Sequence, residues 1–240
     1  MTADQVQEWH AELLSAIESL ADPAYREGSL MVAPTAQRVH GIRTPDNRRL
    51  AREWRRAQRD VDPAVVLSLV EVLWNAESRD ERALGLEILN LHPDLVRDLE
   101  VARFDRWRLD IDNWGVCDFV GTRILGPWVA AEPEDRLRYL EQLVGDPHLY
   151  SRRLGLVASV YLNTGGTEYG EWTLSQVDRL IDERDPMITK AISWSLRQMT
   201  IHQASIVEAY VDSRTDRMAA LPRREVQNKL RTGRKSGRLD

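Results

Sequence analysis

Two short stretches of the sequence place an aromatic ring one helical turn from a charged side chain. Trp114 and Asp118 are four residues apart in DNWGVCDFVG, and Trp194 and Arg197 are three apart in KAISWSLR. If both stretches are helical, each pair shares one face, because residues three or four apart are neighbours on a helix surface. A carboxylate beside an aromatic ring suits the stabilisation of a developing cation.

Lys190 extends the second pair, because it lies four residues before Trp194 on the same predicted face. A ring between two cations suits contact with phosphates on either side. Asp118, in contrast, has no lysine or arginine at the three or four preceding positions, so its own helix face offers no cationic partner. Ordinary core tryptophans with charged surface neighbours remain an alternative, since a large aromatic residue at helical spacing more often belongs to the core.

The elements that must carry these residues are predicted to be helices. Apolar residues recur at spacings of three and four in most of the chain, as in VVLSLVEVLW and LGLEILNL, and no run shows the period-two alternation of a strand. Asp-Pro, Glu-Pro and His-Pro steps interrupt this pattern every 10 to 40 residues and suit helix starts. We therefore expect an all-α fold of about a dozen short helices, stacked as a solenoid of HEAT-like repeats.

One such domain is expected over residues 1–230, followed by a basic tail, residues 231–240, that we expect to be disordered. The expected loops are 103–112 and the glycine-rich segment 163–171. Among the eight tryptophans, Trp107 and Trp128 stay undecided, and four others are predicted to belong to the core: Trp9, Trp54, Trp74 and Trp172.

Composition favours a soluble, reduced globule. The chain has 240 residues, 42% of them hydrophobic and 30% charged, and no segment reaches the length of a membrane span. Its first residues do not resemble an export signal, and Cys117 is the single cysteine, so it cannot form an internal disulfide. We expect a cytoplasmic, nucleoid-associated monomer in which Cys117 is a packing residue. The five histidines form no closely spaced pair, so no metal site and no cofactor are expected.

Arginine is concentrated in a few places although the net charge is −5. On a helix, Arg48, Arg52, Arg55, Arg56 and Arg59 would form one basic stripe, and further groups stand at 152–153 and 223–238. A single stripe is often only a solvated helix face. Several stripes in an acidic protein favour a basic surface that is kept apart from an acidic one, and they make Arg48 and Arg52 candidate phosphate contacts.

Five motifs, taken in order and spacing, resemble the DNA alkylation repair glycosylases of the AlkD-like, HEAT-like repeat family. They are GIRTPDNRRL (41–50), NWGVCD (113–118), SRRLGLV (151–157), KAISWSLRQ (190–198) and LPRREV (221–226). The resemblance extends from about residue 8 to 230. It implies a curved superhelical stack whose concave face holds double-stranded DNA and excises N-alkylated purines. It also implies capture of the lesion through the DNA backbone without a snug base pocket, which would admit bulky adducts.

The same resemblance assigns roles to particular residues. It implies that Asp118 is the catalytic carboxylate, that Trp114 and Trp194 contact the damaged nucleotide, and that Arg153 and Arg197 contact the DNA backbone. The chain departs from the family at Gly115, where members commonly carry an acidic residue. Because glycine within a helix costs roughly 1 kcal/mol relative to alanine, this departure puts the level of activity and the substrate range in doubt.

Two other functions stay open at this point. A non-catalytic paralogue would bind damaged or branched DNA without releasing a base, and a base-release assay separates it from a glycosylase. A helical-repeat scaffold for another protein would show no salt-dependent affinity for DNA, whereas neutralising phosphates gives a steep salt dependence.

Overall fold

The computed structural model describes residues 3–236, which fold into helices joined by short loops, with no β-strand in this part of the chain. A lone β-bridge joins Arg38 and Ser78. The all-α prediction is thus confirmed. The chain divides into two compact units, residues 1–100 and 101–240. The single repeat domain expected over residues 1–230 remains a prediction.

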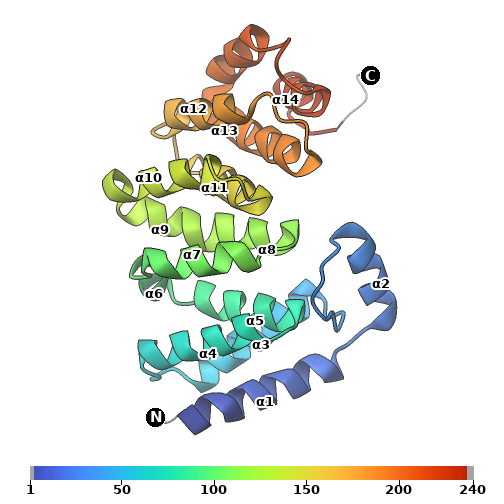
Figure 1. Ribbon diagram of the computed structural model, residues 1–240, viewed down its shortest axis with the longest axis vertical. Helices are drawn as coiled ribbons and strands as arrows, with labels where there is room; N and C mark the ends of the chain where they lie inside the picture. Colours follow the sequence, from blue (N-terminus) through green and yellow to red (C-terminus); the bar gives the residue numbers. More distant parts are fainter. Residues whose placement is uncertain (1–2, 237–240) are drawn as a thin grey trace. The chain divides into compact units, whose positions relative to one another are not determined.

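The helices of each unit follow one another along the chain, and Figure 1 labels them. Unit 1 contains α1 (Ala3–Ser19), α2 (Pro23–Val32), α3 (Thr44–Ala57), α4 (Pro63–Asn75), α5 (Arg79–Asn90) and α6 (Pro93–Arg97). Unit 2 contains α7 (Val101–Asp110), α8 (Trp114–Phe119), the π-helix η1 (Val120–Leu125), α9 (Gly126–Ala131), α10 (Pro133–Val144), α11 (Leu149–Leu162), α12 (Gly170–Leu180), α13 (Pro186–Ser213) and α14 (Ala220–Thr232).

Aspartate and proline together define several helix starts. Asp22, Asp62 and Asp185 each accept a backbone N–H of the first turn that follows, and a proline occupies that turn in each case. The side chain satisfies an N–H group that has no partner within the helix, and proline lacks the N–H that would otherwise be unsatisfied. These three Asp-Pro steps therefore begin helices, as the sequence predicts, whereas Asp146-Pro147 lies just before the start of α11.

Unit 1 is built by α1, α3, α4 and α5, which pack on one another. Trp9 of α1 and Trp54 of α3 meet edge to face at 5.5 Å between ring centroids. Trp74 of α4 is buried, and the Arg82 guanidinium lies over its ring at 4.4 Å. These three tryptophans belong to the core, as predicted.

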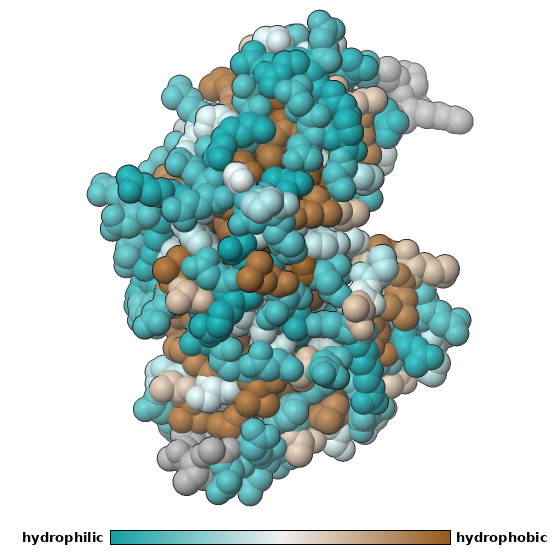
Figure 2. Space-filling model, viewed as in Figure 1, coloured by the Kyte–Doolittle hydropathy of each residue, from teal (hydrophilic) through white to brown (hydrophobic). Residues whose placement is uncertain are grey.

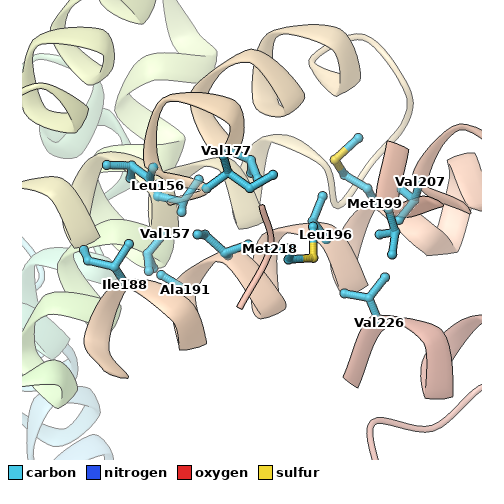
Figure 3. Close-up of a cluster of buried hydrophobic side chains, with 14 of the residues drawn as sticks. Leu156, Val157, Val177, Ile188, Ala191, Leu196, Met199, Val207, Met218 and Val226 are labelled. Atoms are coloured by element: carbon cyan, nitrogen blue, oxygen red, sulfur yellow. The ribbon is translucent and has the colours of Figure 1, made fainter. Parts of the chain in front are cut away.

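Unit 2 is organised around α11, which contacts the helices on both sides of it in the chain. Ten of its 14 residues are buried, including Leu154, Leu156 and Val157. Leu156 and Val157 also belong to a hydrophobic cluster to which α12, α13 and α14 contribute, shown in Figure 3. The buried residues of α11 are consequently held in place by packing against the neighbouring helices. On the surface, mostly hydrophilic side chains cover the face that Figure 2 shows.

Two expectations about loops had different outcomes. The loop predicted at 163–171 is confirmed over residues 163–169, since α11 ends at Leu162, whereas residues 170 and 171 already belong to α12. The predicted loop at 103–112 is wrong, because residues 101–110 form α7. Phe104 and Trp107, three residues apart, are both buried and meet edge to face at 6.2 Å. That packing stabilises a helix in this segment although it contains many charged residues.

The remaining tryptophans and the predicted tail differ in how well they agree with the sequence-based expectations. Trp107 and Trp128 are buried in the core. Trp172 is only partly buried, and its Nε1 donates to Glu141 at 3.0 Å. Within the predicted tail, residues 231 and 232 belong to α14, and residues 233–236 form bends. The rest of the predicted tail, residues 237–240, lies outside the described residues.

Candidate functional site

Asp118 and Arg153 form a bidentate ion pair between α8 and α11. The Arg153 Nε donates to Asp118 Oδ1, and Nη2 donates to Oδ2, each at 2.8 Å. The side chain of Arg153 is 5% exposed and that of Asp118 is 15% exposed. The sequence offered Asp118 no cation on its own helix face. This interpretation was incomplete, because the cation comes from a helix 35 residues further along the chain.

Asn113 fixes the start of the helix that carries Asp118. Its buried Oδ1 accepts the Val116 N–H at 3.0 Å, which makes Asn113 the N-cap of α8. Trp114 is then the first residue of α8, and Asp118 follows one turn later. Both side chains are partly buried and therefore partly reachable from solvent.

Gly115 lies exposed in this first turn. A Cβ atom added there would have one close neighbour, Asn113 Oδ1 at 3.3 Å. The absence of a side chain at Gly115 therefore leaves no gap in the core.

A π-helical stretch, η1, directly follows α8. The Gly126 N–H bonds to the Gly121 carbonyl, five residues earlier, which is the π-helical pattern. Pro127 accounts for this irregularity, because it has no N–H and its ring would clash with the Arg123 carbonyl in a regular α-helix. π-Helical turns within α-helices are frequent at functional sites.

Gly121 and Gly126 bring this segment unusually close to α11. A Cβ atom on Gly121 would lie 2.9 Å from Val157 Cγ1, and one on Gly126 would lie 2.6 Å from Tyr161 Cβ. Contacts this short require a residue without a side chain. The two glycines thus allow the helix of Asp118 to approach the helix of Arg153, and the ion pair forms across that approach.

Burial controls the acidity of the groups at this point of the chain. Desolvation raises the pKa of Asp118 above its ordinary value, although the hydrogen bonds and charge of Arg153 act in the opposite direction. Burial also raises the pKa of the Cys117 thiol, and its Sγ contacts the Tyr150 carbonyl. Cys117 is therefore a buried, protonated packing residue, in agreement with the sequence-based expectation.

Arg153 also ties the ion pair to α13. Its Nη1 donates to the Met187 carbonyl in the first turn of that helix. Counting from Met187, Lys190, Trp194 and Arg197 follow at three, seven and ten residues, so they continue one face of α13. Lys190 is exposed, and Trp194 is partly buried against the hydrophobic cluster of unit 2.

Arg197 is held by a second acidic residue, Glu225 of α14. The Arg197 Nε donates to Ser193 Oγ at 3.1 Å, Ser193 donates to Glu225 Oε2 at 2.6 Å, and Arg197 Nε lies 3.7 Å from the same carboxylate oxygen. Lys235 Nζ lies 3.4 Å from Glu225 Oε1. Burial lowers the pKa of Arg197, but a guanidinium group remains charged at any physiological pH.

The two candidate phosphate contacts of unit 1 lie on α3. Arg48 pairs with Glu87 at 3.0 Å, whereas Arg52 is exposed and makes no ion pair within residues 3–236. Arg59 lies beyond the end of α3, so the predicted stripe is shorter than expected. The phosphate-binding role of Arg48 and Arg52 stays a prediction.

Sequence reasoning missed three contributors to the site: Asn113, Gly121 and Glu225. Asn113 precedes the first apolar residue of α8, which is a helix-start signal. Pro127 within an apolar stretch indicated an irregular helix at Gly121. Glu225 gave no signal, because its contact with Arg197 joins residues that are far apart in the sequence.

No metal or membrane feature accompanies these residues. Within residues 3–236, no three histidine, cysteine or carboxylate side chains gather in an arrangement that could bind a metal ion. None of the helices in that range is both long and apolar enough to cross a bilayer.

Comparison with known proteins gives the family of the chain. No curated protein matches its sequence. A solved structure described as a predicted DNA alkylation repair enzyme from Enterococcus faecalis is similar in fold, with a TM-score of 0.75 and 17% identity over 88% of this chain and 97% of that one. The protein smu.31 from Streptococcus mutans UA159 gives a TM-score of 0.50 and 13% identity, over 82% and 92% of the two chains. The model of the family described as DNA alkylation repair enzyme matches residues 13–230. The chain therefore belongs to the DNA alkylation repair enzyme family.

Proposed function

We propose that the protein is a DNA glycosylase that hydrolyses the N-glycosidic bond of cationic N-alkylated purines in duplex DNA. One observation carries the proposal: a largely buried carboxylate, Asp118, is held in fixed orientation by Arg153 and lies one helical turn from the partly exposed Trp114. Membership of the DNA alkylation repair enzyme family supports DNA as the substrate.

The chemistry of the lesion explains why one carboxylate is sufficient. An N7-alkylguanine or N3-alkyladenine already carries a positive charge, so the base leaves as a neutral molecule when the C1′–N bond breaks. It needs no general acid, unlike the leaving group of most glycoside hydrolases, which use a second carboxyl group. What remains is an oxocarbenium-like sugar that needs negative charge nearby and a water molecule in the right position.

Asp118 can meet both needs. A carboxylate has about four acceptor positions on its two oxygens, and the pair with Arg153 uses one on each. The remaining positions can accept a proton from the attacking water, which then adds to C1′. The negative charge of Asp118 stabilises the sugar cation before that attack. Arg153 keeps the carboxylate ionised and oriented.

The two tryptophans supply the other half of the proposed site. A cation over an aromatic face gains about 0.5 to 2 kcal/mol, so Trp114 and Trp194 can hold the charged base or the developing sugar cation. Both rings are partly buried. The packed side of each ring fixes its position, and the exposed side is available to the nucleotide.

Cations beside this site are proposed to bind the phosphates. Lys190 and Arg197 lie on the same face of α13 as Trp194, and they suit phosphates on either side of the lesion. Arg48 and Arg52 are proposed as further contacts on unit 1. Arg153 is less suited to a phosphate, because it is 4% exposed and its contact with Asp118 would have to break first.

One observation favours a second function, a DNA-binding protein without catalysis. Both oxygens of Asp118 are engaged by Arg153, and a carboxylate of this kind can be a purely structural partner. Such a protein would bind alkylated duplex and leave its bases attached.

Release of free base distinguishes the two functions. Methylated duplex DNA is incubated with excess protein, and free N7-methylguanine and N3-methyladenine are quantified against the same DNA without protein. A glycosylase raises both rates above spontaneous loss. Binding that leaves both rates at the spontaneous level would reject the proposal in favour of the non-catalytic binder.

A further inference from the structure

The last helix carries a charge opposite to that of the whole chain. Residues 219–236 contain one carboxylate, Glu225, and six cations: Arg223, Arg224, Lys229, Arg231, Arg234 and Lys235. The chain as a whole has a net charge of −5. A strongly basic segment in an acidic protein is the electrostatic pattern of a polyanion-binding surface.

Five of these six cations make no ion pair within residues 3–236. Of the six, Lys235 alone has a carboxylate partner within residues 3–236, and that partner is Glu225. Some arginines elsewhere are paired with carboxylates. On α3, Arg48 pairs with Glu87, and Arg49 pairs with both Asp46 and Glu53.

Several of these side chains are exposed on one side of the segment. Arg224 and Arg231 are seven residues apart on α14, so they lie on the same helix face, and both are exposed. Gly233 ends the helix in the left-handed conformation, with a φ of 72°. The chain changes direction there, and the exposed Lys235 reaches Glu225.

α14 is firmly attached to the helix that carries the candidate site. Its residue Val226 is buried in the same cluster as Leu196 and Met199 of α13, as Figure 3 shows. Glu225 accepts from Ser193, next to Trp194, and lies near Arg197. Glu225 thus stands between a cation of the candidate site, Arg197, and a cation of the C-terminal segment, Lys235.

We propose that α14 and the residues after it, to Lys235, form a second phosphate-binding surface for the same duplex DNA, continuous with Arg197. This rests on the proposed function for the identity of the polyanion. Glu225 lies between Arg197 and Lys235, and one carboxylate shared by two cations leaves this part of the surface with a net positive charge. The phosphates bound here would flank the damaged nucleotide and set the register of the duplex without reading its sequence.

The salt dependence of DNA binding tests this surface directly. Affinity for a short unmodified duplex is measured by fluorescence anisotropy at several salt concentrations for the wild type, Arg231→Gln and Arg224→Gln/Arg231→Gln. Each neutralised phosphate contributes about −0.9 to the slope of log K against log salt concentration. The magnitude of the slope should therefore be smaller than that of the wild type by about 0.9 in the single variant and by about 1.8 in the double variant.

Arg138→Gln is the matched control for Arg231→Gln. Arg138 is an exposed arginine of α10, it makes no ion pair within residues 3–236, and α10 carries none of the candidate site residues. It should leave the slope unchanged. Equal slopes for the wild type and both surface variants would overturn the inference, as would a wild type that does not bind duplex DNA.

A parallel base-release assay separates this inference from the proposed function. If the variants lose slope while the wild type releases no purine, the glycosylase proposal fails and the DNA-binding surface stands. If the wild type releases purine but the slopes coincide, the glycosylase proposal stands and this surface does not.

Discussion

Two carboxylate–arginine pairs at the candidate site of unit 2 differ in geometry. Asp118 and Arg153 make two hydrogen bonds of 2.8 Å, and the arginine is almost entirely buried. Glu225 and Arg197 approach no closer than 3.7 Å, with the Ser193 hydroxyl bonded to both. Glu225 also has a second cationic partner, Lys235, whose side chain is 55% exposed.

These two geometries suit the same residue types to two different roles. A bidentate, buried pair fixes the position of its carboxylate, because breaking it would leave an unpaired charge away from water. A longer contact, shared with a hydroxyl and with the exposed Lys235, holds its arginine less rigidly than two direct charged hydrogen bonds. Asp118 is therefore suited to act on a reacting atom, and Arg197 is suited to leave its partner for a phosphate.

Of the substitutions that test this comparison, the loss of Arg153 should lower the rate of base release most. In Arg153→Gln, Asp118 keeps its burial but loses its cation, so its pKa rises further and less of it is ionised. We expect base release to fall by about 100-fold, within the usual range for an acid–base group. Arg153→Lys should restore part of the rate, since it returns the charge but not the two parallel hydrogen bonds.

A structural defect alone would give a different pattern in these variants. The account requires the acid limb of the pH–rate profile to move to higher pH in Arg153→Gln. A slower enzyme with an unchanged acid limb would show that Arg153 supports the fold and not the ionisation of Asp118.

The pH dependence of the wild type follows from the same burial. The pKa of Asp118 is raised above its ordinary value of 3.8, and the ionised form is the active one. The rate should therefore be full above the raised pKa and fall about tenfold per pH unit below it. Single-turnover release, corrected for spontaneous loss at each pH, gives the profile. A rate that stays constant down to pH 3.8 would contradict this assignment.

Gly121→Ala tests whether the Asp118–Arg153 ion pair requires the close approach of η1 to α11. The new Cβ would lie 2.9 Å from Val157 Cγ1, so η1 must move away from α11 and carry Asp118 with it. Overpacking of this kind costs about 1 to 3 kcal/mol, and we expect a lower melting temperature and base release reduced by up to about tenfold. Gly28→Ala, in α2, is the control, because a Cβ atom there meets nothing within 4 Å, and it should lower neither. Equal behaviour of the two variants would mean that the approach at Gly121 does not position Asp118.

Glu225→Gln should have the smallest effect on catalysis. Glutamine keeps the shape of the side chain and an oxygen that can accept from Ser193, so the loss should stay near about 1 kcal/mol and base release should change by less than about fivefold. DNA affinity should rise slightly, because one negative charge beside the phosphates is removed. Kinetics and anisotropy on the same preparation measure the two effects. A loss of release as large as that of Arg153→Gln would place Glu225 in the catalytic machinery and remove the contrast between the pairs.

The sequence predicted the helices well because their signals are local. Proline in the first turn, capping aspartates and apolar spacing all act within a few residues, so the Asp-Pro starts and the core positions of Trp9, Trp54 and Trp74 could be predicted. The segment 101–110 could not, since the burial of Phe104 and Trp107 depends on packing partners that lie elsewhere in the chain.

The candidate site was predictable in its residue types but not in its contacts. Trp114 and Asp118 are related by helical spacing, which the sequence contains. The pairing of Asp118 with Arg153 spans 35 residues and depends on the close approach allowed by Gly121 and Gly126. Such contacts are set by the packing of whole helices.

The most direct test of the central claim is single-turnover release of N7-methylguanine and N3-methyladenine by the wild type and by Asp118→Asn, with DNA affinity measured for both. Asparagine keeps the shape of the side chain and removes its charge. If Asp118 acts on the reacting sugar, release should fall by about 100-fold or more, with DNA affinity essentially unchanged. Release by Asp118→Asn at the wild-type rate would show that this carboxylate does not act on the reacting sugar.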